Sequence, residues 1–599
     1  MSEPSHGGAV LKVRINGREL VAKAGDTLRD VLLANDILFD FPCGGGGSCG
    51  QCTVEVEPLS SVEGKLHRGL PLACQAVLRA DCTVRPREQA DSWVGAAEAG
   101  EVEIGEADRL VRALALTLVP PSLEDQRSDW TRLTEALAAA SIRAENPDPV
   151  QLGDLAARLR SDDWTAHLLV EGNSLLGSAP RLKRCYGLAI DLGTTTVDVA
   201  LYDLETGKQK GRRTVFNRQV SYGADVISRA VAFRADQSAV RSAASSTIAE
   251  AAEALLEEAQ VATASVVRSV VVGNPIMLHI LLGLDPFQLT QAPYIPLITD
   301  SVRRPPAEFG WGFQGKGVVE TLPLISAFVG ADTVGVIVAL GLGAETRISL
   351  ALDVGTNGEI VLARGGQLAA TSAAAGPAFE GAQISCGSRA ITGAITHVTV
   401  GPEGVTCRVL GGGPGRSICG TALIMAVAGM LESGIIDQTG RIVEAEEITC
   451  QALRERLFER DGLLAFALTE DRSVFITQKD VRELQLAKAA IRTAIESLLT
   501  ETATAWSQID RVHLAGNFGA GMSVSSEIRI GLLPPTPLER VDVVGNAALR
   551  GAALVLLSRS GREEARRAAR LCRYVELAGR PEFQQRFADA LLFPLSAST

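Results

Sequence analysis

Residues 41–52 read F-P-C-G-G-G-G-S-C-G-Q-C, and a further cysteine, Cys74, follows Cys52 after 21 intervening residues. Four of the eleven cysteines therefore fall in one short span with the spacing C-x5-C-x2-C-x21-C. Packing does not explain this spacing, because a buried structural cysteine needs no fixed distance from the next one. The glycine run 44–47 lets the backbone wrap round a compact group and direct N–H groups toward it. The stretch predicts an inorganic group held by thiolates.

The nature of that group follows from the spacing. Plant-type [2Fe–2S] centres use C-x4-C-x2-C and a distant fourth cysteine, so that three thiolates from one loop and one from elsewhere complete two tetrahedral irons. This chain has that layout with one extra residue. A zinc site and structural thiols are the alternatives, but a four-cysteine zinc site normally has two C-x2-C pairs, and here only one pair has that spacing. We predict one [2Fe–2S] cluster with the ligands Cys43, Cys49, Cys52 and Cys74.

The composition of the chain limits its class and its partners. A length of 599 residues predicts roughly three or four domains, and 46% hydrophobic residues with 59 glycines are typical of an α/β protein. The net charge of −12 argues against nucleic acid and anionic membranes as partners. The chain has no apolar signal segment at its N-terminus and no apolar run of the roughly eighteen residues that a spanning helix needs. We expect a cytoplasmic protein that binds neither nucleic acid nor membranes.

The segment around the cysteines predicts a small sheet. Alternating residues on both sides of Asn16-Gly17 indicate a β-hairpin, and Asp26-Thr27 is a helix start. Cys82 falls in a predicted strand. The hairpin, helix and two later strands are expected at residues 10–22, 28–35, 53–58 and 81–86. Together with the cluster loop they resemble the β-grasp ferredoxin domain, which we assign to residues 1–87.

Residues 88–108 contain seven acidic residues and no basic one, so we predict a flexible acidic linker. Its role is open, because a tether for the cluster domain and a solvated connector fit the composition equally well. Residues 109–182 then predict a small α+β middle domain without a chemical constellation, with Trp130 and Trp164 in its core. Its elements are a strand before Pro120-Pro121, a helix at 128–140, a second helix at 154–160 and a strand at 166–172.

A duplicated motif follows. Residues 186–203 read Y-G-L-A-I-D-L-G-T-T-T-V-D-V-A-L-Y-D, and about 160 residues later residues 348–363 read I-S-L-A-L-D-V-G-T-N-G-E-I-V-L-A. Two copies of strand, D-x-G-T turn and strand predict two related halves. Gly and Thr at such turns bring backbone N–H groups and hydroxyls to phosphate oxygens. Asp191 and Asp353 are suited to Mg²⁺, which they would hold through its waters. The pair of motifs predicts a nucleoside triphosphate site.

A third loop, V-H-L-A-G-N-F-G-A-G-M at 512–522, is a strand that runs into a glycine-rich turn. The three loops in this order resemble the actin, sugar-kinase and chaperone ATPase (ASKHA) superfamily. The resemblance implies a two-lobed ATPase domain, residues 183–599, that binds ATP and Mg²⁺ in its cleft. The residues it implies at the phosphates and Mg²⁺ are Asp191, Gly193, Thr194, Thr195, Asp353, Gly355 and Thr356. Those it implies at the nucleoside are Gly516, Asn517 and Gly519.

Further stretches are similar to one branch of this superfamily, the reductive activators of corrinoid proteins: 221–229, 271–279, 325–333, 376–387, 478–491 and 544–552. That resemblance covers nearly the whole chain. It implies that the protein returns one electron from its cluster to the inactive Co(II) corrinoid of a methyltransferase corrinoid protein, in an ATP-dependent reaction that restores Co(I). It also implies an upstream reductant, a ferredoxin or a flavoprotein, and a homodimer. The fold class is then a multidomain α/β and α+β chain with β-grasp, middle and duplicated actin-like domains.

Several residues and functions stay open at the level of sequence. Asp332, in G-A-D-T, either orients the attacking water or caps its own helix, with capping favoured, and Glu359 is similarly ambiguous. His279 and His513 lie in apolar contexts and are expected in the core. The alternative functions are a small-molecule kinase with a redox-sensing domain, an activator of a radical dehydratase, and a corrinoid-sensing partner without ATP turnover.

Overall fold

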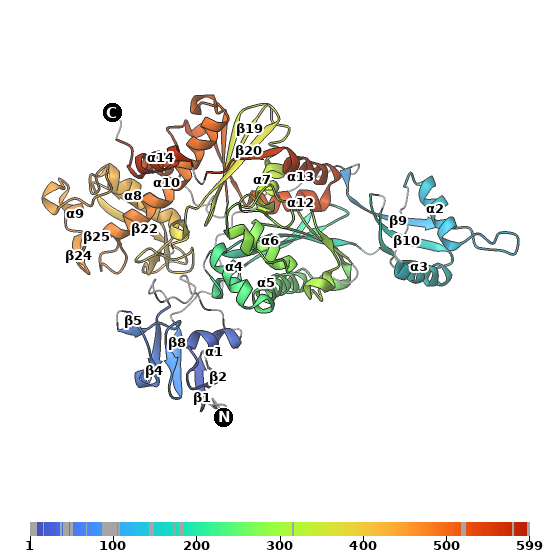
Figure 1. Cartoon of the computed structure of the whole chain (residues 1–599), viewed down its shortest axis with the longest axis horizontal. Helices are drawn as coiled ribbons and strands as arrows, with labels where there is room; N and C mark the ends of the chain where they lie inside the picture. Colours follow the sequence, from blue (N-terminus) through green and yellow to red (C-terminus); the bar gives the residue numbers. More distant parts are fainter. Residues whose placement is uncertain are drawn as a thin grey trace.

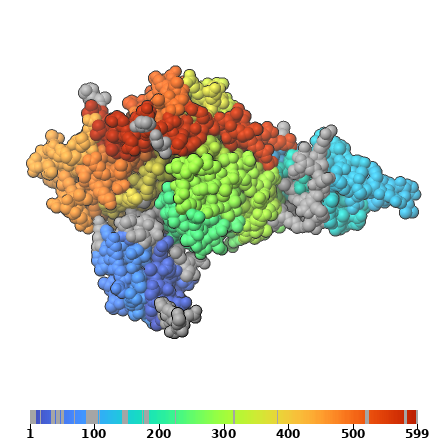
Figure 2. Space-filling view, viewed as in Figure 1, coloured from blue at the N-terminus to red at the C-terminus, as the bar shows by residue number. Residues whose placement is uncertain are grey.

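The computed structural model describes residues 9–15, 17–35, 37, 39, 47, 52–67, 69–86, 105, 108–142, 149–172, 174–178, 184–223, 225–313, 317–381, 383–516, 523–577 and 580–595. An N-terminal module (residues 9–86) and a middle module (residues 109–178) flank a two-lobed body (Figure 1). In the space-filling view the two modules project from the body at different places (Figure 2). No helix within the described residues is long and apolar enough to span a membrane.

The N-terminal module is a four-stranded sheet with one helix across it. The strands are β1 (Val10–Ile15), β2 (Arg18–Lys23), β3 (Val54–Glu57) and β8 (Cys82–Pro86), in the order β2-β1-β8-β3. Helix α1 (Leu28–Ala34) covers the face to which β1 turns its apolar residues. The predicted hairpin, helix and strands are confirmed, and Cys82 is a buried strand residue. Short elements fill the connection: η1 (Leu59–Ser61), β4 (Val62–Glu63), β5 (Leu66–His67), β6 (Leu70–Pro71) and β7 (Val77–Leu78).

The middle module is a three-stranded antiparallel sheet with two helices. Its strands are β9 (Val111–Thr117), β10 (Thr165–Glu171) and β11 (Ser174–Ser178), in the order β11-β10-β9, and its helices are α2 (Asp129–Ala139) and α3 (Pro149–Ser161). Helix α3 begins five residues before the prediction, because Pro149 is suited to the first turn. Strand β11 was not predicted. The predicted linker lies outside the described residues except Gly105 and Asp108, and the predicted domain boundaries stay predictions.

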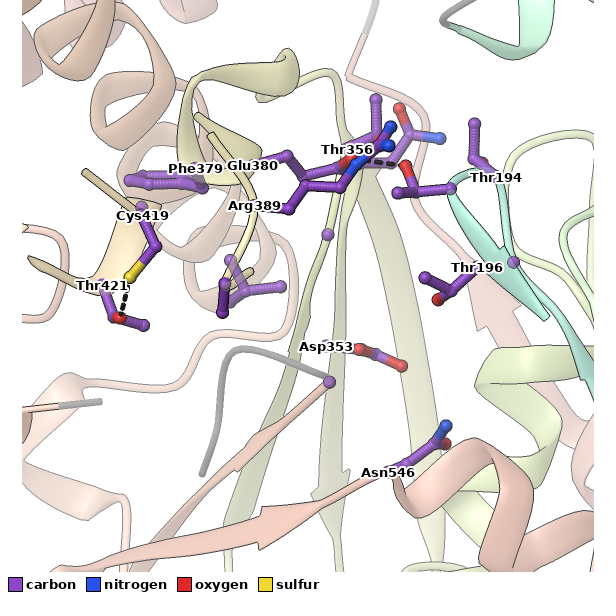
Figure 3. Close-up of a pocket in the computed structure, with 18 of the residues that line it drawn as sticks. Thr194, Thr196, Asp353, Thr356, Phe379, Glu380, Arg389, Cys419, Thr421 and Asn546 are labelled. Atoms are coloured by element: carbon purple, nitrogen blue, oxygen red, sulfur yellow. Dashed lines mark hydrogen bonds between the residues drawn. The ribbon is translucent and has the colours of Figure 1, made fainter. Parts of the chain in front are cut away.

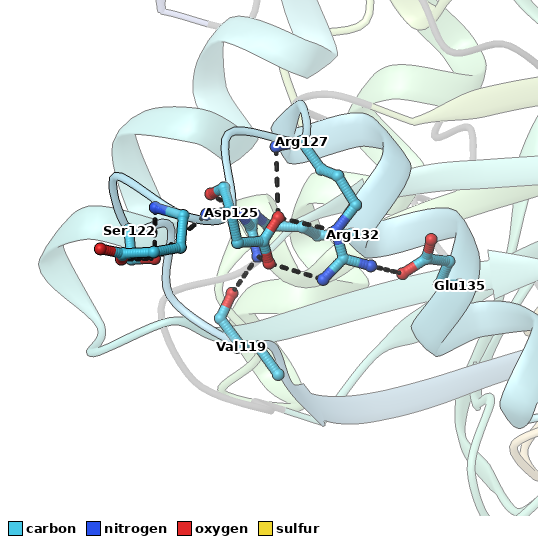
Figure 4. A network of polar contacts seen from close by, with 7 residues as sticks. Val119, Ser122, Asp125, Arg127, Arg132 and Glu135 are labelled. Carbon is cyan, nitrogen blue, oxygen red and sulfur yellow. Dashed lines mark hydrogen bonds and ion pairs between the residues drawn. The ribbon is translucent and has the colours of Figure 1, made fainter.

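A polar network holds the loop between β9 and α2. The buried guanidinium of Arg132 donates to the Val119 carbonyl at 2.9 Å and to Asp125 Oδ2 at 2.7 Å, and Arg127 also donates to Asp125 (Figure 4). Hydrogen bonds from Arg127 and Arg132 lower the pKa of Asp125. The network fixes a long connection that has few apolar residues of its own.

The first lobe is built on a mixed six-stranded sheet in the order β14-β13-β12-β15-β17-β16. Its strands are β12 (Tyr186–Leu192), β13 (Thr196–Asp203), β14 (Gln209–Phe216), β15 (Val266–Gly273), β16 (Arg303–Arg304) and β17 (Val318–Thr321). Its helices are η3 (Arg218–Ser221), α4 (Val226–Ala235), α5 (Gln237–Glu258), η4 (Thr263–Ser265), α6 (Pro275–Leu282), η5 (Phe287–Thr290), η6 (Pro306–Phe309) and α7 (Ala331–Leu340).

The second lobe has a sheet in the order β28-β27-β18-β19-β20-β29. The strands are β18 (Ser349–Val354), β19 (Gly358–Arg364), β20 (Gln367–Ala373), β27 (Arg511–Ala515), β28 (Val541–Gly545) and β29 (Cys572–Tyr574). The helices are α10 (Gln478–Glu501), η9 (Trp506–Gln508), α11 (Val524–Ile530), η11 (Leu538–Arg540), α12 (Ala547–Leu557), α13 (Arg559–Leu571) and α14 (Pro581–Leu591).

An insertion between β20 and α10 extends the second lobe (Figure 1). Its helices are η7 (Pro377–Glu380), α8 (Gly420–Glu432), η8 (Ala445–Glu447) and α9 (Gln451–Arg454). Its strands are β21 (Ala394–Gly401), β22 (Gly404–Val409), β23 (Ser417–Ile418), β24 (Leu457–Arg460), β25 (Leu463–Ala467) and β26 (Phe475–Thr477).

The two lobes repeat one topology, as the duplicated motif predicted. The run β14-β13-β12-β15-β17 of the first lobe corresponds to β20-β19-β18-β27-β28 of the second, with antiparallel hairpins followed by parallel pairs in both. Helices α7 and α12 follow the last strand of each run and pack against each other. A Cβ at Gly551 would lie 2.0 Å from the Gly335 carbonyl oxygen, so only glycine allows this approach. The crossing joins the two lobes.

A buried ionic network attaches the middle module to the first lobe. Glu171, at the end of β10, pairs with Arg268 of β15, Arg303 of β16 and Arg562 of α13, and Glu320 of β17 pairs with Arg268 at 2.7 Å. Glu171, Arg268 and Glu320 are at most 3% exposed. Burial alone would raise the pKa of Glu171, but the guanidinium groups of Arg268, Arg303 and Arg562 outweigh it and lower the pKa to about 2. Glu171 is therefore ionised at neutral pH.

Candidate functional site

A cavity of about 410 Å³ lies between the lobes, where the two D-x-G-T turns face each other (Figure 3). The first turn joins β12 to β13, and the second joins β18 to β19. Most of the nucleotide-site residues predicted from the sequence line this one cavity: Asp191, Gly193, Thr194, Thr195, Asp332, Asp353, Gly355, Thr356, Glu359 and Gly516. Asn517 and Gly519 lie outside the described residues.

Four carboxyl groups form the floor of the cavity. Burial, with the charge of Asp198, raises the pKa of Asp191 well above its ordinary value. Burial, with the charge of Asp332, raises the pKa of Asp353 to about 7, and burial raises the pKa of Asp332 itself to about 6. Burial, with the charges of Asp332 and Asp353, raises the pKa of Glu359 well above its ordinary value. Within the described part of the chain, no lysine or arginine is among the groups that shift the pKa values of these four carboxyls.

This floor fits a hydrated divalent cation. Crowded buried carboxyls stay ionised at neutral pH only if positive charge reaches them. No three metal-ligating side chains among the described residues are arranged to chelate an ion directly. Mg²⁺ keeps most of its waters and contacts carboxylates through these waters, so it matches this donor set. Asp191 from the first lobe and Asp353 from the second are the residues that would hold it.

Two asparagines that were not predicted position the floor and the first turn. Asn546, the N-cap of α12, donates through Nδ2 to Asp191 Oδ2 and Asp198 Oδ2, both at 2.9 Å. Asn274, the N-cap of α6, donates to Thr194 Oγ1 at 3.2 Å. Each follows a glycine at the end of a strand and precedes a helix. The signal that could have found them is this strand–Gly–Asn pattern, which the sequence also has at 516–517.

Glu380 connects the two turns. It ends η7, and its two carboxylate oxygens accept hydrogen bonds from the hydroxyls of Thr195 in the first turn and Thr356 in the second (Figure 3). From the same insertion, the guanidinium of Arg389 lies 5.0 Å from the ring centre of Phe216 in the first lobe. Sequence reasoning used residues 376–387 only as part of a resemblance and assigned no role to Glu380. In this conformation a carboxylate occupies donors that suit a phosphate.

The capping alternative for Asp332 is confirmed only in part, because its carboxylate accepts a first-turn N–H of α7 while the N-cap position belongs to Gly330. Gly330 is the N-cap of α7, without a side-chain hydrogen bond. Asp332 is the second residue of the helix, so its Oδ1 accepts the N–H of the adjacent Thr333 at 2.7 Å while its carboxyl group lines the cavity. Its suggested role in orienting water stays a prediction.

The two histidines do not line the cavity. His279 is a core residue as predicted, since its Nδ1 is 2.7 Å from the Pro275 carbonyl oxygen and its Nε2 accepts the N–H of Leu297 at 3.2 Å. His513 is half-buried on β27, with Nδ1 3.5 Å from Asp542 Oδ2. In the middle module, Trp130 and Trp164 pack at the edge of the core.

The N-terminal module brings two of the four predicted cluster ligands together. Cys52 and Cys74 are buried with their Sγ atoms 3.2 Å apart, well beyond the bond length of roughly 2.05 Å in a disulfide. Cys43 and Cys49 lie outside the described residues. Gly47, with φ +68°, approaches Gln75 so closely that a Cβ would lie 2.8 Å from Gln75 Cγ, and its carbonyl accepts Lys65 Nζ at 2.7 Å. Converging thiols beside a close glycine backbone fit an iron–sulfur cluster.

Comparison with known families divides the chain into four matched regions. Residues 12–79 match the 2Fe-2S iron-sulfur cluster binding domain, and residues 100–184 match the RACo linker region. Residues 186–345 match the RACo middle region, and residues 347–599 match the C-terminal domain of RACo, the ASKHA domain. Together these regions account for both modules and both lobes.

Individual relatives of the chain support the same family assignment. The corrinoid activation enzyme RamQ of Eubacterium limosum is 30% identical over 94% of this chain and 95% of its own length. The [Co(II) methylated amine-specific corrinoid protein] reductase of Methanosarcina barkeri is 26% identical over 63% of this chain and 70% of its length. A solved structure, the reductive activator for corrinoid, iron-sulfur protein, is 32% identical, covers 98% of each chain and superposes with a TM-score of 0.75. The chain belongs to the family of reductive activators of corrinoid proteins.

Proposed function

We propose that this protein passes one electron from a [2Fe–2S] cluster to the Co(II) corrinoid of a methyltransferase corrinoid protein and so restores Co(I), in a reaction that depends on ATP. One observation carries the proposal: the same chain contains a converging thiol pair and an acidic cavity between two lobes. The printed names of relatives that align over most of the chain support the corrinoid protein as the acceptor. A kinase would need neither the thiols nor that partner.

Energetics explain why the reaction needs ATP. Plant-type clusters have potentials of about −400 mV, and reduction of Co(II) to Co(I) is thermodynamically difficult at that potential. For a one-electron couple each shortfall of about 59 mV lowers the equilibrium constant about tenfold. A two-lobed domain that changes state with its nucleotide can favour the productive encounter with the Co(II) protein.

Each set of residues has a role in this scheme. Cys43, Cys49, Cys52 and Cys74 would hold the cluster, which supplies a one-electron carrier when bound. Thr194, Thr195 and Thr356 would bind phosphate oxygens together with the N–H groups at Gly193 and Gly355. Asp191 and Asp353 would hold Mg²⁺ through its waters, and Asp332 would orient the attacking water. Gly516, Asn517 and Gly519 would border the nucleoside.

Two further partners belong to the proposal. The cluster needs an upstream reductant, a ferredoxin or a flavoprotein, because the cycle consumes one electron per corrinoid. Resemblance to the family favours a homodimer.

The test mixes chemically reduced protein, Mg²⁺-ATP, a Co(II) corrinoid protein and its methyl donor without oxygen, and follows the absorbance of methyl-Co(III). We expect product only with ATP. Cys52→Ser should abolish electron transfer and leave ATP binding measurable, whereas Asp191→Ala should abolish ATP binding and leave the cluster reducible. Product formed at the same rate without ATP would reject the ATP-dependent mechanism.

A further inference from the structure

The segment that follows β14 is bonded directly to the first D-x-G-T turn. The backbone N–H of Asn217 donates to the Thr195 carbonyl at 3.0 Å, and its Nδ2 donates to the Gly193 carbonyl at 2.8 Å. Asn217 is fully buried and is also the N-cap of η3, since its Oδ1 accepts the N–H of Gln219 at 3.0 Å. A movement of Gly193 or Thr195 must therefore move Asn217, or leave buried polar groups unpaired.

The other end of the same segment contacts the N-terminal module. The Ser221 carbonyl accepts a hydrogen bond from Arg29 Nη2 at 3.1 Å, and Ser221 Oγ donates to the Phe39 carbonyl at 3.4 Å. Arg29 lies on α1, and Ser221 is the last residue of η3. Phe39 is buried and precedes the predicted cluster ligand Cys43 by four residues. Only three residues of chain, 218–220, thus separate the turn contact from the module contact.

The segment is a stiff connection. Gln219 is fully buried and donates through Nε2 to the Val240 carbonyl of α5 at 3.1 Å. The N–H of Arg218 donates to Thr247 Oγ1, also on α5, at 3.2 Å. A short helical turn held at both ends and along one side transmits a displacement rather than absorbing it.

We infer that residues 217–221 are the positioning link through which nucleotide at the first turn controls how the N-terminal module sits on the first lobe. This inference rests on the proposed function. Phosphate oxygens that bind the N–H groups of the turn at 193–195 reorient its carbonyls, Asn217 follows, and the Arg29 contact at Ser221 loosens. The module is then free to present its cluster to the corrinoid protein. By linkage, a docked module must oppose nucleotide binding by the same factor.

Hydrogen exchange of the full-length protein, with and without Mg²⁺ and the non-hydrolysable ATP analogue AMP-PNP, tests this link. We expect nucleotide to slow exchange at residues 193–197 and to speed exchange at residues 28–35 at least threefold. In Arg29→Ala, residues 193–197 should still be protected, while residues 28–35 should exchange fast under both conditions. Arg29→Lys, which keeps one donor, should restore part of the response. Arg79→Ala is the matched control, because Arg79 forms its ion pair among the described residues with exposed Glu63 on the same module.

Electron transfer supplies a second readout. Arg29→Ala should lose at least fivefold in the ratio of corrinoid reduction rates with and without ATP, with the cluster still fully reducible. Protection at residues 193–197 with unchanged or slower exchange at residues 28–35 in the wild type would overturn the link alone. Absence of protection at residues 193–197 would overturn the proposed function and the link with it. An Arg29→Ala variant that responds like Arg79→Ala would also overturn the link.

Discussion

The two D-x-G-T turns have the same chemistry and different attachments. The first turn, between β12 and β13, is bonded through Asn217 to a segment that contacts the N-terminal module, and the sheet behind it holds the middle module through Glu171. The second turn, between β18 and β19, closes on itself through the Gly355 N–H and the Asn357 carbonyl at 2.9 Å. Its lobe carries the insertion that supplies Glu380 and Arg389 to the cavity.

The different attachments of the two turns show how the two halves of a duplicated fold can have different functions. Both lobes provide a turn and a carboxylate for the nucleotide. The first lobe additionally carries the electron-transfer module, whereas the second lobe covers the cavity. Nucleotide bound between them therefore contacts two bodies with different tasks, which is the arrangement an ATP-dependent electron carrier needs.

The largest effect is expected where the middle module joins the first lobe. Glu171→Ala leaves Arg268 buried with one partner fewer, so the free energy of unfolding should fall by about 3–5 kcal/mol in chemical denaturation. Because the folded pKa of Glu171 is lowered to about 2, its contribution is present above pH 4.5 and is lost as the pH falls toward 2. The gap between wild type and variant should close over that range. A gap of the same size at pH 2.5 and pH 7 would contradict the network.

The crossing of α7 and α12 should give the next largest effect. In Gly551→Ala the new methyl group meets the Gly335 carbonyl oxygen at 2.0 Å, and we expect a loss of about 3 kcal/mol in the free energy of unfolding. Gly335→Ala meets the Ala548 carbonyl oxygen at 2.8 Å and should lose less. Gly153→Ala on α3 is the control, because nothing lies within 4 Å of its new Cβ. Equal melting temperatures for all three variants would show that the lobes do not depend on this contact.

The cavity floor, to which the lobes contribute equally, should make nucleotide binding depend on pH. Burial holds the pKa of Asp353 at about 7 and that of Asp332 at about 6, so these carboxyls take up protons in the nucleotide-free protein and must lose them to Mg²⁺. Mg²⁺-AMP-PNP should bind roughly tenfold more tightly at pH 8 than at pH 6. Titration calorimetry in buffers of different ionisation enthalpy would count the protons released.

The same raised pKa values fix the sign of the stability change. The free energy of unfolding of the nucleotide-free protein should decrease as the pH rises from about 4 through about 7. Asp353→Asn should flatten both profiles. An affinity independent of pH in the wild type would contradict the proton release.

The smallest effect is expected at the contact between the turns. The Glu380 carboxylate accepts from Thr195 and Thr356, and ATP would need the same hydroxyls. Glu380→Gln removes the negative charge that competes with phosphate, so nucleotide affinity should rise about fivefold, which is about 1 kcal/mol. Glu403→Gln, an exposed change in the same insertion, is the control. Weaker binding in Glu380→Gln would instead make Glu380 a direct partner of the nucleotide.

Local patterns predicted the fold well. The two hairpins that contain Asp191 and Asp353 follow from alternating residues around a glycine turn. Residues close together in the sequence are enough to form each of them. The repeat of that unit predicted the paired sheets. Strand β11 was missed although Gly172-Asn173, between Glu171 and Ser174, is a two-residue turn signal that predicts a hairpin.

Residues that reach the site from far along the chain were not predictable in the same way. Glu380 lies 185 residues from Thr195, and Asn546 lies 355 residues from Asp191. Each acts through a single side chain that only the tertiary fold brings to the cavity. Asp332 shows the same limit, since its carboxyl both accepts the first-turn N–H of Thr333 and lines the cavity, and only the tertiary fold shows that one side chain does both.

In the proposed function, nucleotide in the two-lobed body controls electron flow from the N-terminal module. The most direct test of this control is a single-turnover stopped-flow experiment. Pre-reduced protein meets excess Co(II) corrinoid protein and methyl donor, with and without Mg²⁺-ATP, while the visible absorbance of the cluster reports its oxidation. We expect ATP to increase the rate of cluster oxidation at least tenfold. Equal rates with and without ATP, in protein that demonstrably binds the nucleotide, would contradict this control.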